Sequence, residues 1–346
     1  MTEHDGTMDW RQRPATLDDA SAATGMFNAR SRHFYGVDQA SEDQIRAWMG
    51  STQLDLERDT RLITDEKGRI LAWANLNDPG DPCVSITFGL SVAVGFMGNP
   101  ALWDTLLAWC ERRAREVVPR APSGARVVMA FQGLVEDEHR WAAVERAGGV
   151  RVRISNRMRV DLEPNDPQPT SPDGIDWRCA DIDDDLEPLA AAVEEAFRDQ
   201  WGHIERSPDA MLHEWRTSIA MSGDRFDPSL WFLAVDRSTG EIAGFALCEP
   251  DIAGDATLGY VDTLGVRRRW RKRGLGLALL HHAFAELGRR GCVAVELDTD
   301  SESLTGALRL YEKAGMRVIR RQASYEKVLR SGRDLAVREL ERSAGA

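Results

Sequence analysis

The residues best suited to chemistry lie in a basic loop with glycines between positions 267 and 276. Its basic positions are Arg267, Arg268, Arg269, Arg271, Lys272 and Arg273. The loop ends at Gly274-Leu275-Gly276, where two glycines at a helix start let backbone N–H groups approach an anion closely. The helix dipole favours negative charge there, and the basic side chains add counter-charge. The loop therefore predicts a site for a ligand with several phosphates, although it names no reaction.

A strand and a helix must hold this loop. Before it, residues 259–266 favour a strand, in which Val261, Leu264 and Val266 are the apolar β-favouring positions. After it, apolar residues recur at helical spacing. They are Leu277, Leu280, Ala283, Phe284 and Leu287. The alternative interpretation is a solvated basic turn before an ordinary amphipathic helix.

The order Arg271-x-x-Gly274-x-Gly276 after Leu-Gly-Val resembles the acetyl-CoA loop of the GNAT superfamily of N-acetyltransferases. A second segment, residues 304–316, resembles a later helix of the same superfamily. Its matching residues are Ala307, Leu310, Tyr311 and Gly315. Two positions depart from the pattern, because Leu304 replaces a usual asparagine and Met316 a usual phenylalanine. Residues 196–202 and 226–235 resemble tandem, mycothiol synthase-like members.

The resemblance implies acetyl-CoA as cosubstrate and assigns roles to the loop and strand. Cofactor contacts would come from Leu264, Gly265, Val266, Arg271, Lys272, Arg273, Gly274, Leu275 and Gly276. The first three would offer main-chain groups to the pantetheine arm and the thioester oxygen. Tyr311 is the implied proton donor to the departing thiolate, since a phenol with a pKa near about 10 stays protonated. The alternative for Tyr311 is a core residue on one helical face.

The general base is less directly indicated. Many superfamily members carry a glutamate where this chain has Tyr260, and Asp262 lies two residues further on the same strand face. Asp262 is therefore the candidate base, and its alternative is a carboxylate paired with a nearby arginine. Glu249 and Asp251 are rivals that would instead hold a cationic acceptor. Four further residues are expected to line the acceptor pocket, or else to be solvated loop residues: Asp199, Trp201, His203 and Glu205.

The chain contains two related segments on either side of a Pro-rich, polar stretch. Asp9-Trp10-Arg11 reappears as Asp176-Trp177-Arg178, and Glu145 to Gly148 matches Glu312 to Gly315, both offset by 167 residues. Each segment alternates strands and helices, which predicts an α/β fold with a mixed sheet flanked by helices. We expect a degenerate GNAT-like domain at 1–163, a linker at 164–174 and a catalytic domain at 175–346.

The first repeat lacks the polar groups of the second. No Arg or Lys lies between Val92 and Asp104, where the basic loop would be, and Val144 stands at the position of Tyr311. We expect this repeat to be structural and the second to carry the reaction.

Composition narrows the function class. The 346 residues suffice for two domains, and the net charge of −12 argues against a general nucleic-acid binder. The five cysteines are scattered, which is typical of reduced thiols, and no leader or long apolar run appears. We therefore expect a cytoplasmic protein with no nucleic-acid or membrane partner. No His/Cys cluster has metal-ligand spacing, so no metal is expected.

The sequence favours an enzyme that moves an acetyl group from acetyl-CoA to a primary amine of a small cationic molecule. A second reading is an acyl-CoA sensor without catalysis. A third is a nucleic-acid binder that uses the run from Arg267 to Arg273, with Trp270 interleaved. Nothing in the sequence sets the acceptor or the oligomeric state.

Overall fold

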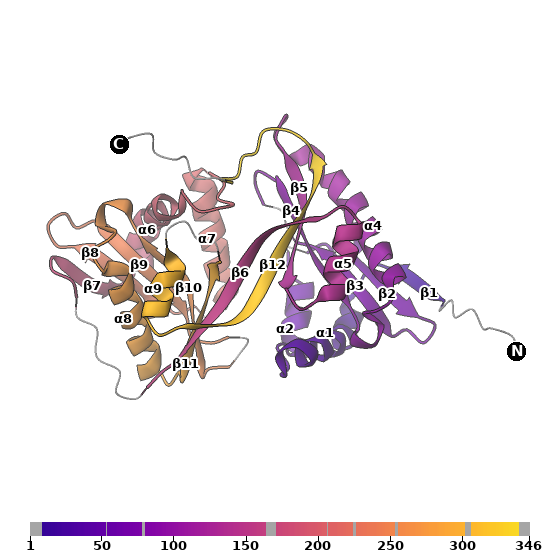
Figure 1. Ribbon diagram of the computed structural model, residues 1–346, viewed down its shortest axis with the longest axis horizontal. Helices are drawn as coiled ribbons and strands as arrows, with labels where there is room; N and C mark the ends of the chain where they lie inside the picture. Colours follow the sequence, from indigo (N-terminus) through magenta and orange to yellow (C-terminus); the bar gives the residue numbers. More distant parts are fainter. Residues whose placement is uncertain are drawn as a thin grey trace, which may run out of the picture. The chain divides into compact units, whose positions relative to one another are not determined.

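The computed structural model describes residues 9–52, 54–77, 80–163, 171–205, 207–223, 226–252, 255–301 and 306–338. The chain divides into two compact units. Unit 1 comprises Met1–Arg153 and Gln322–Asp334, and unit 2 comprises Ile154–Arg321 and Leu335–Ala346. Figure 1 colours the chain from indigo to yellow, so the two parts of each unit can be followed.

Unit 1 is a mixed sheet with helices packed against it. Its elements are β1 (Trp10–Arg13), η1 (Leu17–Asp19), α1 (Ala20–Tyr35), α2 (Glu42–Met49), α3 (Leu56–Asp59), β2 (Thr60–Asp65), β3 (Ile70–Leu76), β4 (Ser85–Val92), η2 (Val94–Phe96), α4 (Pro100–Val117), η3 (Val118–Arg120), β5 (Val127–Leu134) and α5 (Glu138–Arg146). The strands follow the order β1-β2-β3-β4-β5-β12, in which β12 (Arg317–Arg330) takes part through its residues from Gln322 onward. Only β4 and β5 are parallel among the pairs described in this unit.

Unit 2 repeats this arrangement. Its elements are β6 (Val150–Asp161), β7 (Ile175–Cys179), α6 (Ile182–Phe197), α7 (Pro208–Ser222), η5 (Pro228–Leu230), β8 (Trp231–Asp236), β9 (Ile242–Glu249), β10 (Leu258–Val266), η6 (Arg268–Trp270), α8 (Leu275–Arg289), β11 (Ala294–Asp300), α9 (Ala307–Lys313) and β12 (Arg317–Arg330). The strand order is β6-β11-β10-β9-β8-β7. The predicted α/β class with a mixed sheet is confirmed.

The last strand of each repeat completes the sheet of the other unit. β6 ends the first repeat, yet from Ser155 to Asp161 it pairs antiparallel with β11 of unit 2. β12 ends the second repeat, yet from Gln322 to Arg330 it pairs antiparallel with β5 of unit 1. Each compact unit therefore consists of one repeat without most of its last strand, together with the last strand of the other repeat. The boundaries at 163 and 175 follow the repeats and stay a prediction.

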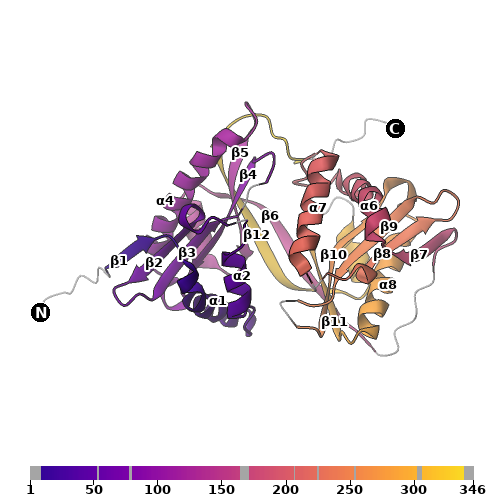
Figure 2. The ribbon, with the colours of Figure 1, turned by 180° about the vertical axis from the view of Figure 1, so that it is seen from behind.

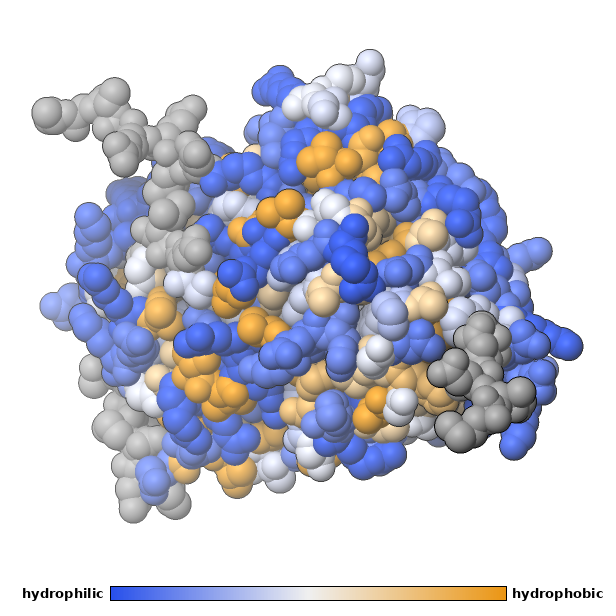
Figure 3. All heavy atoms as spheres, turned by 45° about the vertical axis from the view of Figure 1, so that its right-hand side comes forward, coloured by the Kyte–Doolittle hydropathy of each residue, from blue (hydrophilic) through white to orange (hydrophobic). Residues whose placement is uncertain are grey.

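Helices cover both faces of the unit 2 sheet (Figure 2). One core packs α8 and α9 against the sheet through Leu279, Ala283 and Leu287. The other packs α6 and α7 through Leu189 and Trp215, which lie against Phe245 and Leu247 of β9. Side chains of β9 alternate between these cores because successive residues of a strand point to opposite faces. On the face drawn in Figure 3, hydrophilic residues surround scattered hydrophobic ones.

Candidate active site

The two parallel strands of unit 2 part halfway along their length. β10 and β11 pair at Leu258↔Ala294, Gly259↔Val295 and Tyr260↔Glu296. Beyond Tyr260, β10 continues to Val266 paired with β9 on its other side. A β-bulge at Asp262 marks the change, since Val261 and Thr263 oppose consecutive residues of β9. The main chain from Asp262 to Val266 therefore has one edge outside the β10–β11 ladder, beside the parting strands.

The basic loop joins this strand end to the start of α8. The N-cap Gly274 has φ +79° and, lacking a side chain, leaves the first N–H groups of α8 without a side-chain acceptor. The caps of α6 and α7 differ, because Asp181 and Ser207 accept hydrogen bonds from their own helices. Lys272 also has positive φ, +61°. The start of α8 therefore has the features of an anion site.

The arginines of the loop are largely engaged within the protein. Arg271 donates through Nε to Val266 O at 2.9 Å and through Nη2 to Ala196 O at 2.8 Å. It thereby fixes the loop to the ends of β10 and α6. Lys272 and Arg273 are exposed. Unlike Arg271, these two predicted cofactor contacts donate no side-chain hydrogen bond to a backbone carbonyl among the described residues.

The other three arginines pair with acids. Arg267 binds Glu195 at 2.7 Å, and Arg269 lies 3.2 Å from Glu241. Arg268 pairs with Asp199, which was predicted to line the acceptor pocket. That hydrogen bond is the chief influence that lowers the pKa of Asp199, and burial opposes it. The positive charge of the loop is thus partly neutralised inside unit 2.

The helix that carries Tyr311, α9, lies beside the start of α8. A Cβ at Gly276 would lie 3.3 Å from Leu310 Cδ2 and 3.6 Å from Val266 Cγ2, so α8, α9 and the end of β10 meet here. Tyr311 is 8% exposed and belongs to the same core. Burial raises the pKa of Tyr311 to about 12. The structure thus brings together the start of α8, the end of β10 and the helix that carries Tyr311.

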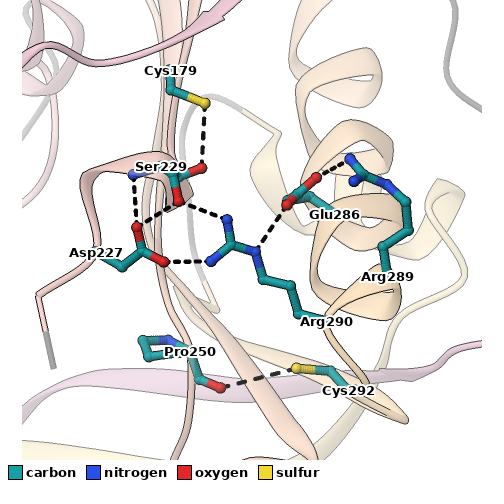
Figure 4. A network of polar contacts seen from close by, with 8 residues as sticks. All are labelled: Cys179, Asp227, Ser229, Pro250, Glu286, Arg289, Arg290 and Cys292. Carbon is teal, nitrogen blue, oxygen red and sulfur yellow. Dashed lines mark hydrogen bonds and ion pairs between the residues drawn. The ribbon is translucent and has the colours of Figure 1, made fainter.

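The far end of α8 is anchored by Arg290 (Figure 4). Its Nε donates to Glu286 of α8 at 2.8 Å, and its Nη2 donates to Ser229 Oγ at 2.7 Å. It also pairs with Asp227, just before η5. These contacts tie α8 to the segment that enters β8, and so help to hold the helix whose other end begins after Gly274.

The remaining predicted acceptor residues lie after α6. His203 Nε2 lies 2.8 Å from Glu194 Oε1. The guanidinium of Arg338 lies 4.7 Å from the ring centroid of Trp201. Glu205 is exposed, and the backbone of Gly202 and His203 pairs with Val337. This loop is thus held by the C-terminal segment of unit 2.

The acidic candidates on the sheet lie near the parting strands. Glu249 is the direct partner of Tyr260 across β9 and β10, and Asp251 follows it. Asp262 is exposed and accepts a 2.7 Å hydrogen bond from Thr263 Oγ1. Its place at the bulge puts this carboxylate beside the free edge of β10.

Two polar residues at this place were missed by the sequence reasoning. Asp298 of β11 accepts a 3.1 Å hydrogen bond from Tyr260 Oη. Arg157 of β6 lies 3.1 Å from Asp298 and 4.8 Å from the centroid of the Tyr260 ring. The alternation of acids in Glu296-x-Asp298-x-Asp300 was the available signal for Asp298. Arg157 gave none, because it precedes the linker and belongs to the first repeat.

Unit 1 has the same parting of strands with a different filling. β4 and β5 pair in parallel as far as Phe88↔Phe131. Beyond this pair, Arg140 of α5 donates to Leu90 O of β4 and, at 3.0 Å, to Gln132 O of β5. The guanidinium therefore bridges the two strands.

A buried acid holds this bridge. Asp137, with a side chain 2% exposed, lies 3.1 Å from Arg140 and 2.6 Å from Arg30. Arg30 in turn donates to Val92 O at 2.7 Å. At the offset of 167 residues, the counterpart of Arg140 is Ala307, whose methyl group is too short to bridge two strands.

The fold and site define an α/β protein with a glycine-capped helix start beside parted parallel strands. The chain is 31% identical to the GCN5-related N-acetyltransferase from Sphaerobacter thermophilus, with a TM-score of 0.78 and coverage of 94% of this chain and 97% of that one. Residues 190–316 match the Acetyltransferase (GNAT) family. The chain belongs to the GCN5-related N-acetyltransferase (GNAT) family, as its loop and later helix indicated.

Curated relatives are similar over part of their length. The mycothiol acetyltransferase of Thermobispora bispora is 32% identical over 174 residues, 49% of this chain and 55% of that enzyme. The one from Arthrobacter sp. is 30% identical over 213 residues, 59% of this chain and 63% of that enzyme. The chain therefore spans less than two thirds of these relatives.

A tandem GNAT protein from the clavulanic acid biosynthesis pathway shares the fold. It has a TM-score of 0.71 at 14% identity, with coverage of 92% of this chain and 98% of that one. Within the described ranges, no group of three or more His, Cys, Asp or Glu residues is arranged to hold a metal ion. No helix in the described part of the chain is long and apolar enough to cross a membrane.

Proposed function

We propose that unit 2 transfers an acetyl group from acetyl-CoA to a primary amine of a small cationic molecule. One observation carries the proposal: the side-chain-free cap of α8, the part of β10 beyond its described ladder with β11, and α9, the helix of the buried Tyr311, converge at one place. Membership in a family of acetyltransferases supports it.

The residues at the start of α8 fit a cofactor with phosphate groups. The N–H groups that follow Gly274 bind the pyrophosphate, and Lys272 and Arg273 add exposed positive charge. Arg271 keeps the loop in shape through its two carbonyl contacts. The main chain of Leu264, Gly265 and Val266 faces the pantetheine arm and the thioester oxygen. Leu275 and Gly276 contribute the first N–H groups of α8 to this site, and the buried Leu275 side chain anchors the helix start in the core.

The transfer is a direct attack by the amine nitrogen on the thioester carbon. The new C–N bond forms as the C–S bond breaks, the amine gives a proton to Asp262, and Tyr311 gives its proton to the departing sulfur. Because burial raises the pKa of Tyr311 to about 12, the phenol holds this proton throughout the neutral range. The same burial disfavours a bare thiolate, which increases the benefit of protonating it.

The acceptor side carries acidic groups suited to a cation. Glu249, Asp251 and Asp262 lie along the strand ends near the bulge, and Glu205 is exposed after α6. His203 and Trp201 hold the loop after α6 in place through Glu194 and Arg338. Asp199 contributes indirectly, because it pairs with Arg268 of the basic loop. Enzymes named mycothiol acetyltransferase are relatives, so their acceptor belongs among those to be tested. We propose no nucleic-acid partner, given the net charge of −12.

The deciding experiment is a thiol-release assay with acetyl-CoA across a panel of amines. The panel includes the acceptor of the mycothiol acetyltransferases, glucosamine, spermidine, an aminoglycoside and a lysine peptide. We expect thiol release that depends on at least one amine. Stabilisation by CoA with no amine-dependent release would instead favour the second candidate, an acyl-CoA sensor, which the same anion site would also serve.

A matched pair of variants tests the cofactor site. Gly274→Glu and Gly36→Glu both place a side chain at positive φ, +79° and +81°, with no heavy atom within 4 Å of the new Cβ. The backbone strain is therefore similar, but only Gly274→Glu adds negative charge at the start of α8. We expect the thermal shift given by CoA to disappear in Gly274→Glu alone; unchanged CoA affinity there would reject the assignment.

A further inference from the structure

The polar cluster around Tyr260 occupies the point where β10 and β11 part. Tyr260 is the last residue of β10 paired with β11, and its partner is Glu296. Its hydroxyl donates to Asp298 Oδ2 at 3.1 Å, two residues along β11. The cluster therefore lies at the opening that the proposed acetyl transfer requires.

Arg157 fixes the direction of the Tyr260 hydroxyl. Its Nε lies 3.1 Å from Asp298 Oδ1, so the two oxygens of that carboxylate serve two different donors. Its guanidinium also lies 4.8 Å from the Tyr260 ring centroid, within the range of a cation–π contact. The ring and the carboxylate are thus held by one cation. The single hydroxyl proton points to Asp298, which leaves the oxygen lone pairs as acceptors.

The surroundings of Tyr260 keep this proton in place. Glu249 faces it from β9, Glu296 and Asp298 face it from β11, and Asp262 lies two residues along β10. The basic groups on β6 are Arg157, beside the Tyr260 ring, and Arg159, beside Glu296. Burial and then the charge of Asp298 raise the pKa of Tyr260. A phenol with a raised pKa does not serve as a base at neutral pH, but its oxygen accepts a hydrogen bond from an ammonium or amine.

We propose that Tyr260, oriented by Asp298 and Arg157, accepts a hydrogen bond from the acceptor's amino group. This inference rests on the proposed function of unit 2. It separates binding of the amine, by Tyr260, from removal of its proton, by Asp262. The acidic neighbours favour a cationic acceptor at the same place.

The test uses Tyr260→Phe with Tyr325→Phe as matched control. Tyr325 also donates its hydroxyl to a carboxylate, Glu145 at 2.9 Å, but it lies in unit 1. The full-length protein is assayed with the best amine of the panel, glucosamine or spermidine for example. A hydrogen bond to a charged group is worth about 1.5–3 kcal/mol, so KM for the amine should rise roughly tenfold to a hundredfold in Tyr260→Phe. We expect little change in kcat, in KM for acetyl-CoA or in the Tyr325→Phe protein.

Two further readouts separate this role from a structural one. Asp298→Ala releases the hydroxyl and should raise the same KM by less, and it should add little in a Tyr260→Phe background because the two act as one unit. The acidic limb of the pH profile of kcat/KM should keep its midpoint in Tyr260→Phe.

The outcomes are distinguishable. Wild-type protein that transfers to no amine overturns the proposed function and this inference with it. Wild-type turnover with an unchanged amine KM in Tyr260→Phe overturns the inference alone. A displaced acidic limb makes Tyr260 part of the proton-removing group and overturns it as well.

Discussion

Where their parallel strands part, the two units share a backbone plan and differ in side chains. In unit 1, the last pair before the opening is Phe88↔Phe131, and Arg140 bridges the strands beyond it. In unit 2, the last pair is Tyr260↔Glu296, and Ala307 stands at the position of Arg140. One long side chain from the following helix thus fills the opening in unit 1. In unit 2 the residue at that position, Ala307, is too short to bridge the two strands.

The comparison also explains how each strand end is finished. Arg30 donates to Val92 O in unit 1, and Arg271 donates to Val266 O in unit 2. The carbonyl is satisfied in both units, by an arginine from a helix in one and from the basic loop in the other. Satisfying buried carbonyls is a requirement of folding. Arg271 therefore has a structural role, because its guanidinium satisfies a carbonyl at the end of β10.

The largest expected effect comes from removing the hydroxyl of Tyr311. A general acid contributes on the order of 10²–10⁴-fold, so kcat of Tyr311→Phe should fall by that factor with KM for acetyl-CoA nearly unchanged. Because burial raises the pKa of Tyr311 to about 12, the phenol stays protonated below that value. The pH profile of kcat should therefore keep its shape below about pH 11 when the hydroxyl is removed. Steady-state kinetics over pH measures both. Turnover as fast as the parent, when transfer is rate-limiting, would assign Tyr311 to the core only.

The next effect is on stability and belongs to unit 1. Asp137→Ala leaves the guanidinium groups of Arg30 and Arg140 buried without their shared acid. Breaking a buried ion pair in this way costs about 3–5 kcal/mol of unfolding free energy. Denaturant unfolding should show this loss, while kcat and KM of the folded protein stay near the parent values. A large fall in kcat would mean that unit 1 takes part in the reaction.

Filling the counterpart of Tyr311 should be milder. Val144 is 1% exposed, and its Cγ1 lies 2.5 Å from where a Cβ of Gly149 would be. Val144→Phe should therefore lower stability by about 1–3 kcal/mol through overpacking, without altering the transfer rate. Thermal unfolding and the thiol-release assay test the two halves of this expectation separately.

The number of acetyl-CoA molecules bound per chain tests whether Arg140 alone prevents cofactor binding in unit 1. Calorimetric titration should find one acetyl-CoA per chain in the parent and also in Arg140→Ala. The loop of the first repeat lacks basic residues between Val92 and Asp104, so opening the strands does not restore an anion site. A second equivalent site in Arg140→Ala would show that the side chain, rather than the loop, makes the difference.

The smallest effect concerns Lys272, which holds a left-handed conformation at φ +61°. Lys272→Gly should raise the free energy of unfolding by about 0.5–1 kcal/mol, because glycine adopts positive φ without strain. The same change should weaken CoA binding, because it removes a positive charge. Lys272→Asn is the matched control, since asparagine tolerates this conformation and also lacks the charge. Both variants should lose affinity equally; a loss in neither would exclude Lys272 from the cofactor site.

Local patterns in the sequence predicted much of the fold. The strand before Arg267 and the helix after Gly274 appear where apolar spacing placed them, and the helix with Tyr311 appears where the resemblance placed it. The contacts of Arg271 were beyond such reasoning, because Ala196 O lies 75 residues away in the chain. The bulge at Asp262 was equally hidden, since it depends on the register between β9 and β10.

The sequence by itself determined which repeat carries the polar groups: Tyr311 against Val144, and a glycine-capped basic loop against one without charge. Those are properties of residue type and short spacing. The tertiary structure alone decided that Arg157, from the first repeat, stands beside Tyr260 and Asp298 of the second. The physical reason is the exchanged strand β6, which pairs with β11 instead of staying with its own repeat. Strand pairing across such a separation is set by the whole sheet, and no local pattern encodes it.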